Sequence, residues 1–269
     1  MVPRIAVSAT RAQTHYVQTH LVRGSDGEDS PALSWVRSGA PHPELNRVLR
    51  VGPDAVERSI ALMDHAPALW SVWPNAGDGN AVERALERNG LVFVEEEPLL
   101  VLPLDPGAAS GLPEDAAVPG VEIEACRTLE QLREWVSFWA AEAVSPERFP
   151  EIVRALAGPA GLDGSADAEA TPAVTHFLAR SSDAATRGRV LGCAALVIAG
   201  LSAAVEHVIT AQAERGRGIG SWLTRRVIEG AHDAGAEACV LTSSPDGLGL
   251  YTRLGFRPEC RIRSYAFPA

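Results

Sequence analysis

The segment Arg215-Gly216-Arg217-Gly218-Ile219-Gly220 lies between a predicted strand and a predicted helix, and its composition suits an anion-binding turn. Glycines let the backbone turn tightly and approach a ligand without a Cβ in the way. The unpaired N–H groups of a first helical turn, together with the helix dipole, favour an anion at that point. Because Arg215 and Arg217 add positive charge, we predict that this turn binds a diphosphate.

Two other kinds of phosphate loop fit this segment poorly. A dinucleotide-binding fingerprint has the spacing G-x-G-x-x-G and opens the first βα unit of a sheet, whereas this turn has G-x-G-x-G late in the chain. A P-loop needs a lysine, and all 24 basic residues of the chain are arginine. A dinucleotide-dependent oxidoreductase is therefore kept only as a third alternative.

A second motif, Tyr251-Thr252-Arg253-Leu254-Gly255-Phe256, follows the turn by about 30 residues, after a predicted strand. Together the two motifs resemble those of the GNAT superfamily of acyl-CoA N-acyltransferases. The first motif of that family is Arg/Gln-x-x-Gly-x-Gly/Ala, and Arg215, Gly218 and Gly220 fill its places. The resemblance covers Val121–Phe267, and residues 1–104 are similar to the degenerate first copy of tandem GNAT proteins.

The resemblance implies acetyl-CoA as the cofactor. The strand Val205–Thr210 would splay from its neighbour, so that pantetheine pairs with its backbone, and Tyr251 would protonate the leaving thiolate. Ser244 stands where the family commonly has asparagine, and Gly247 stands at a usual alanine, so one cofactor contact is expected to differ. The residues assigned to the cofactor are Val208, Ile209, Thr210, Arg215, Gly216, Arg217, Gly218, Ile219, Gly220, Ser221 and Ser244.

The general base is assigned to Glu206, because a glutamate on this strand often serves in the family, directly or through water. The attacking amine is protonated in water and must lose a proton to become a nucleophile. Strand alternation leaves the face of Glu206 open, and His207, on the opposite face, is the second candidate.

Residues 121–269 are expected to fold as a mixed α/β domain, because strand and helix patterns alternate along them. Thr128 with Gln131 predicts a capping box at the start of the first helix. The predicted strands are Val121–Ala125, Val174–Arg180, Arg189–Ala199, Ala203–Thr210 and Ala238–Thr242, with a strand pair after Phe256. The predicted helices are a first one after Thr128, Pro146–Ala157, Gly218–Ala234 and Gly247–Leu254.

Residues 1–104 show related signals, and residues 105–120 are interpreted as a linker rich in proline and glycine. Strand, helix, strand, helix, glycine and strand follow one another in both halves, with Gly90 opposite Gly255, which predicts a duplication. In the first half we expect strands at Leu45–Val51 and Leu69–Trp73, helices at Asp54–Ala66 and Asn80–Gly90, and a hairpin of Leu91–Val94 with Leu99–Leu102. His15 and His20 are expected in a loop.

The first copy has Leu86 where the second has Tyr251, and it lacks the arginine–glycine turn. We therefore predict that it cannot bind acyl-CoA and that it buries part of the catalytic half or shapes the acceptor pocket. The tryptophans that could line such a pocket, although core positions are the commoner reading, are Trp70, Trp73, Trp135 and Trp139.

Composition narrows the class of protein. With 34 acidic residues and a net charge of −10, nucleic acid is an unexpected partner. No apolar run is long enough for a membrane span, and the start lacks a signal-peptide core. The four cysteines lack metal-ligand or disulfide spacing, so we expect free thiols, no metal site and a cytoplasmic protein, monomeric or homodimeric.

The sequence thus predicts two tandem GNAT-like α/β domains, the first degenerate. The predicted activity is acetyl transfer from acetyl-CoA to a primary amine of a small molecule or peptide, directly within a ternary complex. A non-catalytic acyl-CoA sensor is the alternative, and the acceptor itself is left open.

Overall fold

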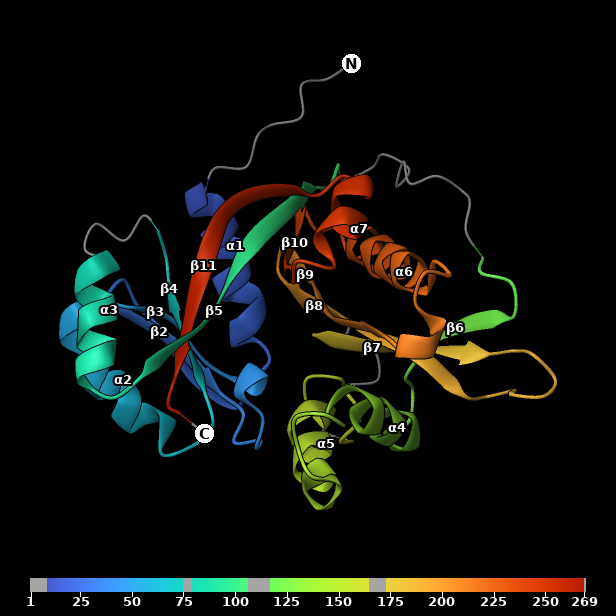
Figure 1. The fold of residues 1–269 in the computed structure, drawn as a ribbon, viewed down its shortest axis with the longest axis horizontal. Helices are drawn as coiled ribbons and strands as arrows, with labels where there is room; N and C mark the ends of the chain where they lie inside the picture. The colour runs from blue at the N-terminus through green and yellow to red at the C-terminus, as the bar shows by residue number, and fades with distance from the viewer. Residues whose placement is uncertain (1–8, 75–78, 106–116, 165–172, 269) are drawn as a thin grey trace.

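The computed structural model describes residues 9–74, 79–105, 117–164 and 173–268. Within these ranges eleven strands form one mixed sheet, and seven α-helices pack on its faces (Figure 1). We call residues 9–105 the N-terminal half and residues 117–268 the C-terminal half. Most of the linker expected at 105–120 lies outside the described residues.

The N-terminal half comprises α1 (Ala9–Leu21), β1 (Asp26–Asp29), β2 (Leu33–Arg37), β3 (Asn46–Val51), α2 (Val56–Met63), β4 (Leu69–Val72), α3 (Gly79–Arg88) and β5 (Val92–Pro103). The C-terminal half comprises β6 (Val121–Ala125), α4 (Leu129–Trp139), α5 (Phe149–Ala157), β7 (Val174–Ser181), β8 (Val190–Ala199), β9 (Ser202–Thr210), α6 (Ile219–Asp233), β10 (Ala238–Thr242), α7 (Leu248–Arg253) and β11 (Arg257–Ala266). The predicted elements of the C-terminal half are confirmed up to α7, with ends shifted by one or a few residues.

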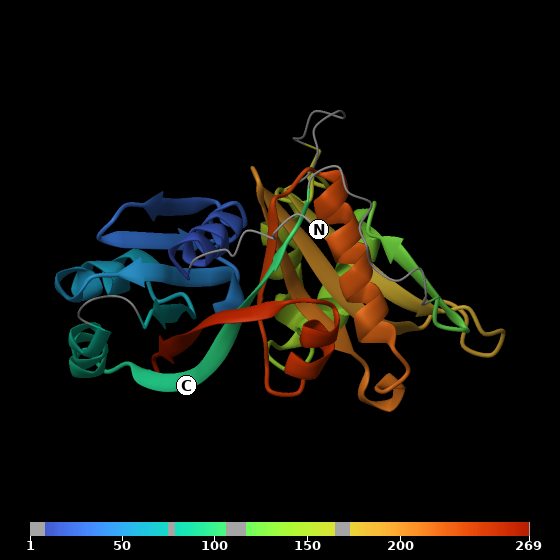
Figure 2. The ribbon, with the colours of Figure 1, turned by 90° about the horizontal axis from the view of Figure 1, so that it is seen from above.

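The two halves exchange their last strands. The strand order is β1-β2-β3-β4-β11-β5-β10-β9-β8-β7-β6, so β5 lies between β10 and β11, and β11 lies between β4 and β5 (Figure 2). In each half a parallel pair, β3–β4 or β9–β10, is followed first by the other half's last strand and then by its own. This matching order confirms the tandem architecture, and neither half alone contains its complete sheet.

The long exchanged strands correct two predictions. The hairpin expected at Leu91–Val94 and Leu99–Leu102 is one strand, β5, and the strand pair expected after Phe256 is one strand, β11. Each runs across the junction and pairs with the other half, and both follow a glycine with positive φ, Gly90 (86°) or Gly255 (95°). Glycine fits that left-handed backbone, so the short match around these two positions reflects a shared helix-to-strand turn.

The helices cover the sheet in a way that separates its two faces. One face carries α1, α4 and α5 over a core that runs through both halves, including Leu49, Leu99, Ala204 and Val240. The other face carries α6 and α7 in the C-terminal half and α2 and α3 in the N-terminal half, each pair over its own core. In α6 the buried residues at four-residue spacing match the predicted apolar stripe of Ile219, Leu223, Val227 and Ala231.

Helix α1 corrects the loop expected around His15 and His20. Its side chains Ala12, Tyr16 and Val17 are buried, and the helix packs against β9 and β10 at the junction of the halves (Figure 1). His15 bonds the Ser202 hydroxyl at 2.7 Å. Tertiary packing, rather than a strong apolar pattern of its own, therefore stabilises this helix.

Local signals elsewhere act as predicted. Thr128 accepts a hydrogen bond from the Gln131 N–H, and the Gln131 side chain reaches back to the Thr128 N–H, which confirms the capping box. All four cysteines are free thiols. No helix in the described part of the chain is long and apolar enough to cross a membrane.

Candidate functional site

Strands β9 and β10 separate after a short parallel ladder. Their pairing runs from Ser202–Ala238 to Ala204–Val240 and then stops, although β9 continues to Thr210 and β10 to Thr242. Beyond Ala204, the edge of β9 that faces β10 has no strand partner among the described residues. An extended ligand can add to such an edge through main-chain hydrogen bonds.

A β-bulge redirects the free part of β9. Ala195 pairs with Glu206 and Cys193 with Ile209, so β9 carries one residue more than β8 over this interval. His207 takes a left-handed backbone with φ of 55°, which is costly for a residue with a side chain and is often found near functional sites. The Ala194 carbonyl, opposite the bulge, accepts a hydrogen bond from the Trp135 indole at 3.1 Å.

The turn before α6 has the backbone of an anion cradle. Gly216 and Gly218 have φ of 80° and 92°, and Gly218 caps α6 without any side-chain hydrogen bond. The N-cap residue of α6 therefore leaves the first N–H groups of this helix without a side-chain cap. A Cβ at Gly220 would lie 3.3 Å from Leu250 Cδ1 and 3.4 Å from Thr210 Oγ1. The glycine thus keeps the space between α6, α7 and β9 open.

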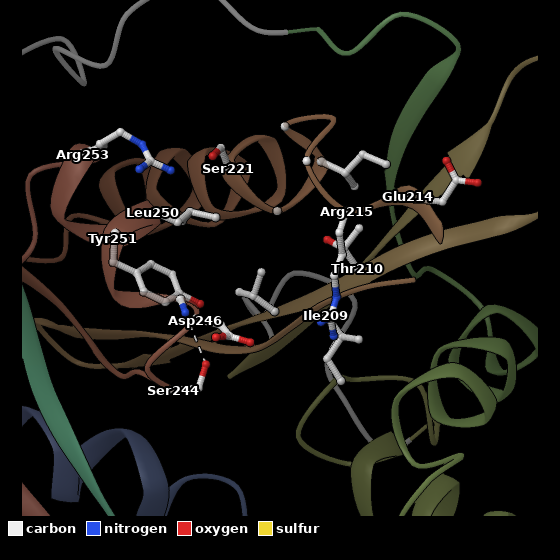
Figure 3. Close-up of a pocket in the computed structure, with 17 residues that line it drawn as sticks. Ile209, Thr210, Glu214, Arg215, Ser221, Ser244, Asp246, Leu250, Tyr251 and Arg253 are labelled. Carbon is white, nitrogen blue, oxygen red and sulfur yellow. Dashed lines mark hydrogen bonds between the residues drawn. The ribbon is translucent and has the colours of Figure 1, made fainter. Parts of the chain in front are cut away.

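These elements enclose a pocket of about 540 Å³, shown in Figure 3. It contains every predicted cofactor contact except Arg217, together with the predicted acid Tyr251. Sequence reasoning did not assign to the site the further lining residues Glu214, Asp246, Gly247, Gly249, Leu250 and Arg253. Arg253 belongs to the Tyr251–Phe256 motif, so a positive charge two residues after Tyr251 was the sequence feature that could have indicated it.

Arg217 departs from its expected place. Its guanidinium pairs with Glu214 and also donates to the Pro119 carbonyl at 3.2 Å. Glu214 holds Arg189 as well, at 2.5 Å, and both contacts lower the pKa of the Glu214 carboxyl. Arg215, in contrast, lines the pocket.

Tyr251 enters the pocket from α7, and its side chain points toward β9 (Figure 3). The residue is 9% exposed, and no described residue forms a hydrogen bond with its hydroxyl. Burial, then the charges of Glu206 and Glu97, raise the pKa of Tyr251 to about 12. The hydroxyl is therefore protonated at neutral pH and free to donate.

Glu206 lies outside the pocket lining, on the sheet face that carries α1. Its Oε2 is 3.2 Å from Arg23 Nη1, and its Oε1 is 3.9 Å from His20 Nε2. Burial raises the pKa of Glu206, and the charges of Arg23 and Arg47 oppose that rise. The carboxylate thus lies beside the separated strands β9 and β10. It is on the face of the sheet that carries α1, whereas α6 covers the other face.

His207 is a poor candidate for the base. Arg23 Nη2 lies 2.5 Å from His207 Nε2 and donates to it, while the ring stacks 4.5 Å from Trp139. Burial and the Arg23 charge hold the pKa of His207 well below its ordinary value. The imidazole is therefore neutral, and the lone pair of its Nε2 already accepts the hydrogen bond from Arg23.

The corresponding place in the N-terminal half is filled by a side chain. Strands β3 and β4 pair in parallel at Arg47–Leu69 and Val48–Trp70. Just beyond, the Trp73 indole N–H donates to the Leu49 carbonyl at 2.6 Å. The four tryptophans suggested for an acceptor pocket are all buried core residues. The main-chain edge that is open on β9 is therefore occupied on β3. Among the described residues no group of three or more His, Cys, Asp or Glu side chains could hold a metal ion.

Comparisons with known proteins agree with this geometry. Residues 173–258 match the family model of the acetyltransferase (GNAT) domain, which spans β7 to the start of β11. Glucosamine 6-phosphate N-acetyltransferase 1 of Oryza sativa subsp. japonica is 32% identical in an alignment of 88 residues that covers 30% of this chain. That match covers 53% of the rice protein, so the chain spans about half the length of this curated relative.

Two solved structures resemble almost the whole chain. A GCN5-related N-acetyltransferase from Kribbella flavida has a TM-score of 0.63 at 20% identity and covers 98% of this chain and 97% of its own. A tandem GNAT protein from the clavulanic acid biosynthesis pathway has a TM-score of 0.54 at 16% identity and covers 98% of both chains. At such identities the likeness establishes the fold, that of tandem GNAT proteins.

Proposed function

We propose that this chain, which carries a GNAT acetyltransferase domain at residues 173–258 in a tandem GNAT fold, transfers an acetyl group from acetyl-CoA to a primary amine. One observation carries the proposal. The free edge of β9, the glycine turn before α6 and the unpartnered Tyr251 hydroxyl meet in a single pocket.

The pocket suits the parts of acetyl-CoA in order. The edge of β9 at Val208–Thr210 offers main-chain groups to the amides of pantetheine. The open N–H groups at the start of α6, with Arg215, offer positive potential to the diphosphate. Arg253 and Ser221 also line the pocket and supply further polar groups. We propose Ser244, near Tyr251, as the cofactor contact that replaces the family's asparagine.

We propose direct transfer between the two bound substrates. Glu206, directly or through one water, takes a proton from the ammonium group of the acceptor, and the freed nitrogen pair attacks the acetyl carbonyl carbon. The carbon–sulfur bond then breaks with its electron pair on sulfur, and the Tyr251 hydroxyl gives that sulfur a proton. The surplus proton on the new amide nitrogen returns to Tyr251, and Glu206 releases its proton to water.

The N-terminal half is proposed to bind no acyl-CoA, because Trp73 occupies the β3 edge that corresponds to the free edge of β9. The half instead completes the sheet of the C-terminal half through β5, and it supplies Arg23 beside Glu206. We propose that activity requires the full chain rather than residues 121–269 alone.

Gly247→Ala is expected to lower kcat about tenfold, since a shift of about 1 Å in a catalytic group can cost about 100-fold. The added Cβ would lie 3.0 Å from Tyr251 Cε2 and 3.1 Å from Ser243 Oγ. The Tyr251 ring must therefore move to make room, but by less than about 1 Å. Steady-state kinetics measure the effect, and an unchanged kcat would show that Gly247 does not set the position of Tyr251.

The function is tested by incubating the full chain with acetyl-CoA and a panel of primary amines, and following both thiol release and the acetylated amine by mass spectrometry. Saturable thiol release that depends on the amine is expected. Binding of acetyl-CoA without transfer to any amine would favour the sensor, and absence of binding would overturn the proposal altogether.

A further inference from the structure

Strand β5 brings a carboxylate from the N-terminal half to the point where β9 and β10 separate. Leu99 of β5 pairs with Thr242, the last residue of β10, and the Ser243 N–H donates to the Pro98 carbonyl at 3.2 Å. Glu97 is therefore the second residue of β5 beyond the end of β10, after Pro98. The Thr242 side chain is close enough to the Glu97 carboxyl to lower its pKa, against the larger effect of burial, which raises it.

Glu97 shares a sheet face with Glu206. Side chains alternate along a strand, and Leu99, two residues after Glu97, lies in the core beneath α1. Ala204, two residues before Glu206, lies in the same core. The two carboxylates thus come from opposite sides of the splay, one from each half of the chain, and lie on the face away from α6.

Among the described residues, Glu97 and Glu95 differ from the other carboxylates nearby in forming no ion pair with an arginine. Glu206 pairs with Arg23, and Glu44 pairs with Arg47. Neither Glu97 nor Glu95, two residues before it on the same face, forms a salt bridge with an arginine in the described parts of the chain. Both are accessible, Glu97 partly and Glu95 fully. The negative charge of this pair is therefore available to a ligand.

Glu97 does not line the pocket, but it lies beside the end of β10, next to the point where β9 and β10 separate. Burial and the charge of Glu95 raise the pKa of the Glu97 carboxyl, with a smaller part from Glu44 and an opposing one from Arg47. Glu97 and Glu206 in turn both act on the pKa of Tyr251. The hydroxyl of Tyr251, on a side chain that is nine-tenths buried, has no hydrogen-bond partner among the described residues and points toward β9, the strand that carries Glu206.

We propose that Glu97 binds the ammonium group of the acceptor and so selects a cationic alkylamine that carries no carboxylate or phosphate near the reacting nitrogen. The inference rests on the proposed acetyl transfer and names the substrate class for that site. An ammonium ion held between Glu97 and Glu206 balances charge that the protein itself leaves unbalanced. An anionic group in the same place would face Glu95 and Glu97.

Two variants of one strand test this assignment. Glu97→Gln removes the charge and keeps the shape, and Glu96→Gln is the matched control, since Glu96 lies on the opposite face and pairs with Arg261. The assays are the KM and kcat for the best amine of the screen, the Kd for acetyl-CoA and the thermal midpoint. A further arm compares propylamine, 1,3-diaminopropane and 3-aminopropanoate, in which the group close to the reacting nitrogen is a methyl, an ammonium or a carboxylate.

Glu97→Gln is expected to raise the KM of the amine about 30-fold, the scale of a lost charge-assisted hydrogen bond, with kcat within about threefold and acetyl-CoA affinity unchanged. Glu96→Gln is expected to leave all three within about twofold. The diamine should be the best of the three matched acceptors and the aminopropanoate the poorest.

Three results separate the possible failures. An unchanged KM in Glu97→Gln, with transfer intact, overturns the role of Glu97 and leaves the acetyltransferase proposal standing. A best acceptor with a carboxylate or phosphate beside its amine overturns the substrate class. Acetyl-CoA binding without transfer to any amine in the wild-type chain overturns the proposed function, and this inference with it.

Discussion

Tyr251→Phe is expected to lower kcat for acetyl transfer about 100-fold, the lower end of what a positioned proton donor contributes, with the affinity for acetyl-CoA retained. The hydroxyl is aimed into the pocket from a nine-tenths buried side chain and has no partner among the described residues. With a pKa of about 12 it holds its proton at neutral pH and can donate it to sulfur. Thiol release at saturating acetyl-CoA and amine measures the loss.

Tyr265→Phe is the matched control for this change. Tyr265 is 1% exposed on β11, where its ring contacts Phe93, and it lies outside the pocket. The control loses the same oxygen atom and is expected to keep kcat within about twofold. Wild-type rates in Tyr251→Phe would show that Tyr251 is not the acid and that water protonates the leaving thiolate.

Gly220→Val is expected to weaken acetyl-CoA binding about 30-fold while the chain stays folded, because forcing extra methyl groups into occupied space costs about 2 kcal/mol. A Cβ at this position would lie 3.3–3.9 Å from Leu250, Thr210 and Val208, all of which line the pocket. The position is helical, so the side chain adds no backbone strain. Isothermal titration of acetyl-CoA measures the affinity.

Gly220→Ala gives the graded comparison. Its single Cβ makes contacts of 3.3 Å and longer, so the loss of affinity is expected to be well below that of the valine variant. Equal affinity in the wild-type and valine proteins would mean that acetyl-CoA does not lie between α6 and β9. A thermal midpoint measured alongside shows whether either variant is merely unfolded.

The pocket could be predicted from the sequence because its parts are local. The Arg215–Gly220 turn and the Tyr251–Phe256 motif each carry their conformation in a few adjacent residues, notably the glycines at positive φ. A strand, a turn and a helix in succession then place these motifs on the same side of the sheet. The side-chain direction of Arg217 could not be predicted, because it depends on a partner, here Glu214, that the motif does not specify.

The strand exchange could not be predicted in the same way. β5 contains Glu95-Glu96-Glu97-Pro98, a charged run with a proline. Such a run is typical of a turn, so it agrees with a hairpin whose two strands lie before and after it. In the structure the run remains extended because β11 pairs with it along its length, and β10 pairs with the residues that follow it, Leu99–Pro103. Long-range pairing decides such cases, and it brings Glu97 to a site built mainly by the other half.

Helix α1 was missed for a related reason. Its sequence is mostly polar, and its buried face includes two histidines, so the apolar period is weak. Its environment appears only when β9, β10 and β3 come together at the junction. Arg23, just after this helix, is consequently a partner of Glu206 that no local pattern indicates.

Acetyl-CoA titration of the full chain, combined with hydrogen–deuterium exchange of the complex, tests the central claim most directly. The account predicts one acetyl-CoA per chain, with new amide protection confined to the end of β9 at Val208–Thr210 and to the start of α6 at residues 215–221. Two bound molecules per chain, protection at β3 and α2, or no binding would contradict it.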